Sequence, residues 1–365
     1  MNSVQEAKRL GQSIWLDYIR RDLITSGELQ KLVQSGLSGM TSNPTIFQKA
    51  IAQSNDYDKA LRAILKSSPD VNIKTIYERL AVEDIQMVAD ILRPVYDATQ
   101  GLDGLVSLEC SPHLAHDTDN TIAEARHLWQ LVNRPNVMIK VPSTPQGIPA
   151  TEALIAEGIN VNVTLMFSLK HYEAVSHAYI RGMAQNPKPS RVSSVASFFV
   201  SRIDTYVDRE LEKIGTKEAL AFRGKAAIAN SKLVYRRFRE VFFGEKFAAE
   251  RKRGARVQRV LWGSTSTKNP AYSDVMYVEG LIGPDTVNTV PLETLAAFRN
   301  HGKVRRTVDQ GVKEAEQLLV KLSKLGVDLD AITEQLQKDG VKAFADSFDQ
   351  LLGALEEKRK VWAAY

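Results

Sequence analysis

The chain has 365 residues, of which 44% are hydrophobic and 25% charged, and its 48 basic and 43 acidic side chains give a formal net charge of +5. This composition excludes a disordered or fibrous protein and allows a sizeable buried core. The small basic excess is compatible with anionic small molecules as ligands.

Eight short runs rich in Val, Ile and aromatic residues predict strands at 14–19, 39–47, 104–111, 137–143, 160–167, 191–199, 257–265 and 285–291. Amphipathic stretches between them predict crossover helices at 28–35, 77–97, 120–132, 151–157, 169–183 and 199–214. Strands that alternate with helices pair in parallel, and eight such units favour a (β/α)8 TIM barrel over a doubly wound sheet. The active site of such a barrel lies at the C-terminal ends of its strands.

Two segments depart from a plain barrel. A charged helical stretch at 216–253 predicts an insertion between the sixth and seventh strands, and a helical tail is expected from about Val304 to residue 365. Neither segment is typical of a separate core, so we expect residues 1–365 to form one α/β domain.

Polar residues recur with period two in the predicted strands, although a parallel barrel strand is covered on both faces and should be apolar. In the fifth strand Asn160, Asn162 and Thr164 share one face, opposite an apolar face that includes Leu165. The apolar face would pack on helices, so the polar face is expected to point into the barrel.

The same alternation predicts three ionisable side chains inside the barrel. Asp17 shares a face with Trp15 in the first strand, and Glu109 shares one with Ser107 in the third. In the fourth strand, Lys140 stands between apolar neighbours. Alone, each could be a strand-end cap, a rim carboxylate or a surface lysine. Together they indicate a site, because buried charges need a partner or a ligand.

A lysine enclosed with two carboxylates is suited to amine chemistry. Apolar walls disfavour the ammonium form of Lys140 and favour the free amine that attacks a carbonyl, whereas nearby carboxylates have the opposite effect. Whichever of these two effects on Lys140 is larger, Asp17 and Glu109 can supply the proton transfers of Schiff base formation.

The motifs around these residues resemble those of transaldolase, the class I, Schiff-base enzyme of the non-oxidative pentose phosphate pathway. The resemblance covers about residues 11–300 and is carried by WLD at 15–17, TSNPTIF at 41–47, LEC at 108–110, MIKVPSTPQGI at 138–148, NVTLMFS at 162–168 and SFFVSR at 197–202. It implies transfer of a dihydroxyacetone unit from sedoheptulose 7-phosphate to glyceraldehyde 3-phosphate. The products would be erythrose 4-phosphate and fructose 6-phosphate, and neither a cofactor nor a metal is expected.

The resemblance also implies a role for each matching residue. Lys140 would form the imine, Asp17 would exchange a proton with the C4 hydroxyl, and Glu109 would assist dehydration through a water held with Thr164. The residues expected to bind substrate are Asn43, Asn162, Ser197, Arg202 and Lys268. Among these, Arg202 would meet the phosphate at a helix start, and Lys268 would replace the family's arginine at a position shifted by one.

Two other functions fit the same barrel. A class I aldolase similar to fructose 6-phosphate aldolase would release free dihydroxyacetone from the same imine. A sugar-phosphate sensor or scaffold would keep the barrel and lose turnover, which the complete set of Asp17, Glu109 and Lys140 argues against. The expected partners are therefore phosphosugars, and the expected assembly is a monomer or a homodimer.

Other patterns predict ordinary surface features. His113 and His116 lack a third imidazole or a cysteine at ligand spacing, so we expect exposed loop histidines and not a metal site. The basic run from Arg251 to Arg259 lacks interleaved aromatic residues, which favours a solvated surface over a nucleic-acid interface.

The single cysteine bears on location. Because Cys110 is alone, no internal disulfide can form, and we expect a reducing, cytoplasmic environment with Cys110 as a buried structural thiol. The N-terminal residues are polar, and no uninterrupted apolar stretch approaches the length of a membrane span, so neither secretion nor membrane insertion is expected.

Overall fold

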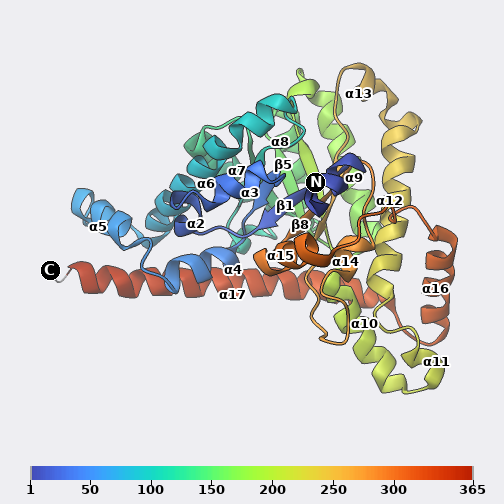
Figure 1. Cartoon of the computed structure of the whole chain (residues 1–365). Helices are drawn as coiled ribbons and strands as arrows, with labels where there is room; N and C mark the ends of the chain where they lie inside the picture. Colours follow the sequence, from blue (N-terminus) through green and yellow to red (C-terminus); the bar gives the residue numbers. More distant parts are fainter. Residues whose placement is uncertain (1, 364–365) are drawn as a thin grey trace.

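The computed structural model describes residues 2–363 and contains a closed barrel of eight parallel strands in sequence order (Figure 1). The strands are Gln12–Asp17 (β1), Gly39–Thr41 (β2), Leu105–Glu109 (β3), Val137–Pro142 (β4), Val161–Met166 (β5), Ser194–Phe199 (β6), Arg259–Gly263 (β7) and Thr286–Val290 (β8). Pairing of β8 with β1 closes the sheet, so the predicted (β/α)8 barrel is confirmed.

Helices surround the barrel and connect its strands (Figure 1). Up to β5 they are Ser3–Arg9 (α1), Arg21–Thr25 (α2), Glu28–Gln34 (α3), Pro44–Phe47 (α4), the π-helix Gln48–Ala52 (η1), Asp58–Ser67 (α5), Ile73–Ala98 (α6), the 3₁₀ turn Pro112–Leu114 (η2), Thr118–Val132 (α7) and Gly147–Ala156 (α8). After β5 they are Leu169–Gln185 (α9), Pro189–Arg191 (η3), Ser201–Ile214 (α10), Lys217–Leu220 (α11), Ala226–Phe243 (α12), Glu245–Phe247 (η4), Ala248–Lys252 (α13), Met276–Glu279 (α14), Leu292–His301 (α15), Val312–Lys324 (α16) and Leu329–Ala363 (α17).

Short polar side chains begin the helices that follow β3 and β5. Asp117 accepts a hydrogen bond of 3.1 Å from the Asn120 amide at the start of α7. Ser168 accepts one of 3.0 Å from the His171 amide at the start of α9. These N-caps satisfy amides that lack a partner within the helix, so the turn from strand to helix occurs at the C-terminal end of the barrel.

The second strand is shorter than the predicted run at 39–47. It ends at Thr41, and α4 begins at Pro44, which has no N–H to donate to a ladder and is favoured in the first turn of a helix. Asn43 caps α4 by accepting a hydrogen bond of 2.9 Å from the Ile46 amide. Asn43 therefore lies beyond the strand, and its predicted inclusion in a strand at 39–47 is wrong.

The predicted alternation of faces is confirmed for the apolar residues of the early strands. Trp15 and Met138 belong to a cluster inside the barrel, whereas Ile14 and Ile139 belong to the larger core between strands and helices. Asn160 departs from its predicted inward role. Its Nδ2 donates to backbone carbonyls, one of them Val137 O at 3.0 Å, where the fourth strand begins.

The fifth strand contains a bulge at Leu165. This residue has a φ of 60°, and the pairing register with β6 shifts between Val163 and Met166. A left-handed conformation costs a residue with a Cβ about 1–2 kcal/mol, so surrounding contacts must hold it. The alternation predicted from the sequence therefore fails at Leu165, and its side chain approaches Gly340 of α17.

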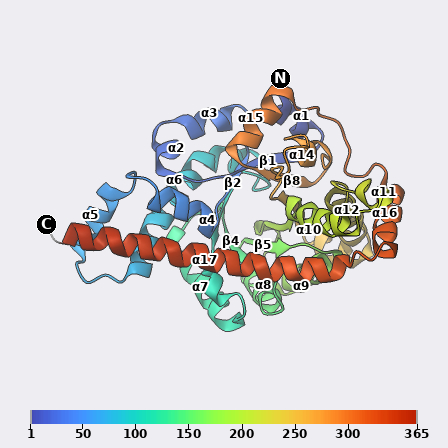
Figure 2. The same cartoon turned by 90° about the horizontal axis from the view of Figure 1, so that it is seen from below.

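The insertion and the tail join the barrel's own core. From the insertion, α12 packs against α9, α10 and α16. The tail differs from its predicted start near Val304, because α16 begins only at Val312. Buried residues of the tail, such as Phe344 and Leu351, belong to the core that covers the barrel strands. The last helix, α17, runs across the C-terminal side of the barrel (Figure 2) and lies against α4, α6 and α10.

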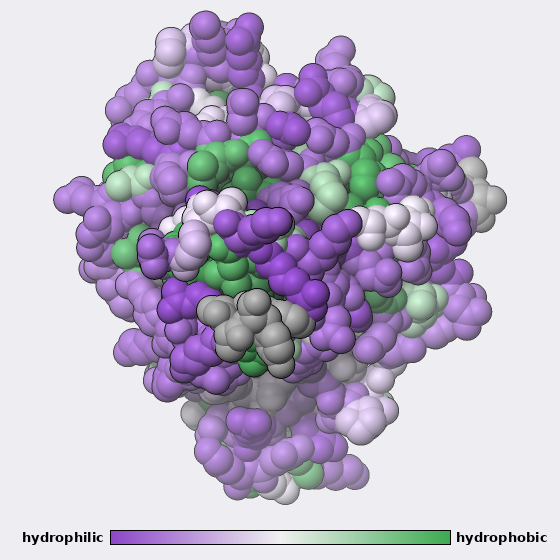
Figure 3. Space-filling view, turned by 90° about the vertical axis from the view of Figure 1, so that its left-hand side faces the viewer, coloured by the Kyte–Doolittle hydropathy of each residue, from purple (hydrophilic) through white to green (hydrophobic). Residues whose placement is uncertain are grey.

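The outer surface is largely hydrophilic on the face shown in Figure 3, where hydrophobic residues lie in separate small areas. Helices that combine enough length with enough apolar sequence to cross a membrane do not occur among the described residues.

A buried ion pair lies inside the barrel among residues at the beginning of β1 and β7. Arg259 Nη2 lies 3.0 Å from Asp103 Oδ1, and both side chains are almost fully buried. Arg259 Nη1 donates to Ser13 Oγ at 2.8 Å, and Trp15 Nε1 donates to Asp103 at 3.0 Å. The expectation of a solvated basic surface is therefore wrong for Arg259, which is the first residue of β7.

We expect Arg259→Met to lower the free energy of unfolding by about 3–5 kcal/mol, because it leaves the Asp103 carboxylate buried and unpaired. Denaturant unfolding measures the loss. The double variant Asp103→Leu with Arg259→Met should recover much of it, since no lone charge remains. As a control, Arg93→Met breaks an exposed pair with Asp97 and should cost less than about 1 kcal/mol. An equal loss of unfolding free energy in Arg259→Met and Arg93→Met would contradict a stabilising role for the buried pair.

Candidate active site

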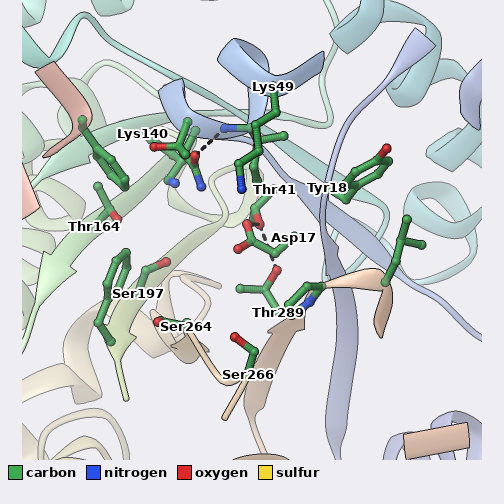
Figure 4. A pocket seen from close by; sticks show the side chains of 18 of the residues that line it. Asp17, Tyr18, Thr41, Lys49, Lys140, Thr164, Ser197, Ser264, Ser266 and Thr289 are labelled. Atoms are coloured by element: carbon green, nitrogen blue, oxygen red, sulfur yellow. Dashed lines mark hydrogen bonds between the residues drawn. The ribbon is translucent and has the colours of Figure 1, made fainter. Parts of the chain in front are cut away.

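A cavity of about 730 Å³ opens at the C-terminal ends of the strands (Figure 4). Its lining includes most of the residues predicted from the sequence, namely Asp17, Asn43, Lys140, Thr164, Ser197, Arg202 and Lys268. Residues of β4, β5 and β6 face residues of β1, β2 and β8 across the cavity in Figure 4. The barrel thus brings together side chains that are far apart in sequence.

Lys140 occupies the buried end of this cavity, and its side chain is only 5% exposed. Its Nζ donates to Ser42 O at 3.1 Å and lies 3.2 Å from Glu109 Oε2. The parallel register places Lys140 directly beside Glu109 on β3 and Asn162 on β5. Two partners from neighbouring segments therefore fix the position of the amine.

Asp17 ends β1 and faces the same cavity. Thr41 Oγ1 donates to Asp17 Oδ1 at 2.8 Å, and the hydroxyls of Thr41 and Thr289 are 2.8 Å apart. Burial raises the pKa of Asp17 above its ordinary value, and the charge of Lys140 and the Thr41 bond oppose the shift. A carboxyl group with a raised pKa is suited to exchange protons nearer neutral pH.

Glu109 lies behind Lys140 and borders a smaller neighbouring cavity with Tyr77 and Glu124. Burial raises the pKa of Glu109, and the positive charge of Lys140 opposes this. Thr164 Oγ1 is buried and has no hydrogen-bond partner among the described residues, whereas Glu109 Oε2 is paired with Lys140 Nζ at 3.2 Å. A buried hydroxyl of this kind usually binds a small polar molecule such as water, so the Thr164 hydroxyl is available to a ligand of the cavity.

Asn162 does not line the cavity, although it was predicted to contact substrate. It is fully buried, and its Nδ2 donates to Ser107 Oγ at 3.0 Å. Ser197, which does line the cavity, donates from its hydroxyl to Asn162 Oδ1 at 2.6 Å. Asn162 therefore supports Ser197 from behind.

Cationic side chains gather at one side of the cavity. Arg202 is the second residue of α10, and its guanidinium lies 5.6 Å from the centre of the Phe199 ring. Lys268 follows β7, and its Nζ donates to Ser266 Oγ at 2.6 Å. Burial lowers the pKa of both groups, and for Lys268 the positive charge of Arg202 adds to the effect. Like charges held together in this way favour a bound anion.

Several lining residues were missed by the sequence analysis. Thr41 and Thr289 are polar residues at strand ends, and Thr289 shares the inward face with Val287, so the period-two signal could have found it. Lys49 lies on η1, a π-helix, and Phe344 lies on α17. Sequence periodicity places neither of these two at the site, because both arrive through tertiary packing.

The remaining sequence candidates have separate environments. His113 Nε2 lies 2.7 Å from Asp349 Oδ1, whereas His116 Nδ1 lies 3.4 Å from Gln146 Oε1, and both histidines are exposed. Cys110 is buried, and burial raises the pKa of its thiol well above the ordinary value. This agrees with a structural thiol and not with a nucleophile.

The barrel and the cavity at its C-terminal end define an enzyme of the (β/α)8 class. The model of the family described as Transaldolase/Fructose-6-phosphate aldolase matches residues 14–355. A protein named transaldolase from Thiobacillus denitrificans is 48% identical over 360 residues, which cover 97% of this chain and 100% of that protein. One from Thermobifida fusca is 45% identical over 361 residues, which cover 97% of this chain and 98% of that protein. The chain belongs to the transaldolase/fructose-6-phosphate aldolase family, as the resemblance predicted.

We expect Arg202→Ala to weaken the binding of inorganic phosphate about tenfold or more, because hydrogen bonds to charged groups contribute roughly 1.5–3 kcal/mol. Isothermal titration calorimetry measures the change in Kd. Arg181→Ala is the control, since Arg181 pairs with Glu152 on the outer helices. An unchanged Kd in Arg202→Ala would contradict an anion site at this side of the cavity.

Proposed function

We propose that this protein is a transaldolase that moves a dihydroxyacetone unit from sedoheptulose 7-phosphate to glyceraldehyde 3-phosphate through an imine on Lys140. The reaction belongs to the non-oxidative pentose phosphate pathway. The observation that carries the proposal is the buried Lys140 amine, 3.2 Å from Glu109, in the cavity that also contains Asp17. Relatives named transaldolase that match nearly the whole chain support it.

Imine formation begins when the Lys140 amine attacks C2 of the ketose and forms a carbinolamine. The attack requires the neutral amine, and Glu109 is placed to take a proton from it. The raised pKa of Glu109 makes this carboxylate a better proton acceptor than an ordinary glutamate. Glu109 then returns the proton to the departing hydroxyl, through a water held with Thr164, and water leaves.

Carbon–carbon cleavage follows from the protonated imine. Asp17 takes the proton of the C4 hydroxyl, the C3–C4 bond breaks, and its electron pair moves into the imine to form an enamine. Erythrose 4-phosphate leaves as the aldehyde. In the second half, the enamine carbon attacks the aldehyde of glyceraldehyde 3-phosphate, and Asp17 returns the proton to the new hydroxyl. Hydrolysis of the imine then releases fructose 6-phosphate.

Polar residues of the lining hold the substrate during these steps. Ser197, supported by Asn162, and the side-chain amide of Asn43 are placed to bind sugar hydroxyls. Arg202 and Lys268 are placed to bind the phosphate. Such fixed contacts are needed to retain the three-carbon unit between the two half-reactions. Without them the enamine would be protonated, and hydrolysis of the resulting imine would release dihydroxyacetone before the acceptor arrives.

A second function uses the same chemistry. The family's description also names fructose-6-phosphate aldolase, which would release dihydroxyacetone without an acceptor. The two differ in what happens to the three-carbon unit when no aldehyde is present. Product analysis with and without acceptor separates them. For a transaldolase, we expect fructose 6-phosphate to form only when glyceraldehyde 3-phosphate is present, and no free dihydroxyacetone to accumulate without it.

A cytoplasmic location and a monomeric or homodimeric assembly are proposed with this function. Phosphosugars are intracellular metabolites, and a lone buried Cys110 is compatible with a reducing environment. No metal or cofactor enters the proposed steps, since Lys140 itself supplies the electron sink.

Borohydride reduction in the presence of fructose 6-phosphate tests the nucleophile. We expect a three-carbon adduct on Lys140, found by peptide mass mapping, because reduction fixes the imine as a stable amine. Lys140→Ala should form no adduct and lose at least about 10³-fold in kcat, as expected when a covalent nucleophile is removed. An adduct on another lysine, or none, would remove the central assignment.

The pH dependence of kcat/KM tests Asp17. Asp17 must be ionised to accept the hydroxyl proton, and its pKa is raised. We therefore expect activity to fall with decreasing pH at a value above the ordinary aspartate pKa of about 3.9. Thr41→Val removes a hydrogen bond that lowers this pKa, so it should move the acidic limb to still higher pH.

Thr118→Val serves as the control for Thr41→Val, because Thr118 donates its hydrogen bond to Gln146 O in a loop outside the cavity. Its acidic limb should match that of the unmodified protein. Identical limbs in all three proteins would contradict the role proposed for Asp17.

A further inference from the structure

The C-terminal helix α17 forms part of the wall of the active-site cavity. Phe344 lines the cavity directly, although it lies far along the chain from the barrel strands. Gly340, one turn earlier, lies so close to the barrel that a Cβ at this position would be 2.8 Å from Leu165 Cδ2 and 3.8 Å from Arg202 Nη1. The helix therefore touches both β5 and the start of α10 (Figure 2).

Gln337 makes a direct hydrogen-bonded connection from α17 to the barrel. The side chain is buried, and its Nε2 donates to Ser143 Oγ at 2.9 Å, to Leu165 O at 3.1 Å and to Ser143 O at 3.2 Å. Ser143 follows β4, and Leu165 lies near the end of β5. One amide group thus joins the two strands that carry Lys140 and Thr164.

The segment that Gln337 holds is the bulge in β5. Leu165 has a positive φ that is unfavourable for a residue with a Cβ, so the conformation needs support from surrounding contacts. Ser143 Oγ donates to Leu165 O at 2.9 Å, and the Ser143 amide donates to Thr164 O at 2.8 Å. Gln337 completes this set of bonds from outside the barrel.

We propose that Gln337 is a positioning residue for Thr164. By fixing the carbonyl of Leu165 and the backbone of Ser143, Gln337 sets the direction in which the Thr164 hydroxyl, without a partner in the part of the chain that the structure describes, points into the cavity. This inference rests on the proposed function, in which Thr164 and Glu109 hold the water used to form and hydrolyse the imine. Gln337 itself does not touch the reacting atoms.

Other bonds of α17 attach the helix without reaching β5. Tyr206 donates to Asp339 Oδ2 at 2.5 Å on the side of α10, and His113 contacts Asp349 near η2. Lys358 binds Asp58 at the far end. These contacts offer controls. Removing one of them should loosen the attachment of the helix and leave the hydrogen bonds at Leu165 in place, so the effect of a looser helix can be separated from the effect of an unsupported bulge.

Gln337→Met keeps the length and apolar packing of the side chain and removes the donor. We expect this variant to form the Lys140 imine about tenfold more slowly, which corresponds to the loss of one positioning hydrogen bond. The rate is measured by mixing enzyme with fructose 6-phosphate, quenching with borohydride at successive times, and quantifying the Lys140 adduct by peptide mass.

The transfer step provides the internal comparison. Erythrose 4-phosphate is added to enzyme that already carries the three-carbon imine, and the quench is repeated. The conversion of the three-carbon adduct into the seven-carbon adduct uses no water, so Gln337→Met should leave its rate within about twofold of the unmodified protein. A general loss of structure would slow both steps.

Two further variants keep the test decisive. Tyr206→Phe removes a tether of the same helix and should change neither rate. Gln337→Glu places a carboxylate against two carbonyl oxygens at neutral pH, but its protonated form can donate a hydrogen bond again. Its rate of imine formation, relative to the unmodified protein at the same pH, should therefore rise as the pH falls.

Equal slowing of imine formation and transfer in Gln337→Met, or equal slowing of imine formation in Tyr206→Phe, would overturn the proposal. So would an unchanged rate of imine formation in Gln337→Met. Failure of the proposed function is a different result, because the unmodified protein would then form no adduct on Lys140 at all.

Discussion

The arrangement of the active site depends on one buried contact, the pair formed by Lys140 and Glu109. Isolated charges at this depth would be very costly, and the pair is tolerated because the barrel register places β3 and β4 side by side with both side chains inward. The same enclosure raises the pKa of Glu109, which makes its carboxylate a better proton acceptor than an ordinary glutamate. The Lys140–Glu109 pair and the proton transfer that we propose between its members thus depend on the same geometric constraint.

The two ends of the barrel use buried polar groups differently. Near the beginnings of β1 and β7, Arg259 and Asp103 satisfy each other and nearby donors, so that end is closed and structural. At the other end, Asp17 and Lys140 border open space, and the Thr164 hydroxyl has no partner among the described residues. Satisfied charges stabilise a fold, whereas incompletely satisfied ones are available to a substrate.

The tail helix shows how a segment outside the barrel can influence chemistry inside it. Close approach at Gly340 allows Gln337 to reach the bulge at Leu165, and Phe344 becomes part of the cavity wall. The left-handed residue in β5 is unfavourable on its own, and hydrogen bonds from Ser143 and Gln337 to its carbonyl support it. The strain and its compensation belong to segments far apart in the chain.

Local sequence patterns were enough to predict the eight strands, the inward lysine and carboxylates, and the family, because period-two polarity and short motifs are properties of short segments. They failed where a local pattern competes with tertiary packing. Asn43 is a helix cap and not a strand residue, Arg259 is buried in an ion pair with Asp103 inside the barrel, and Leu165 interrupts the strand alternation with a positive φ. The place of Phe344 in the cavity wall and the bond from Gln337 to Leu165 follow from tertiary packing, since the contact between α17 and β5 joins residues with no shared periodicity.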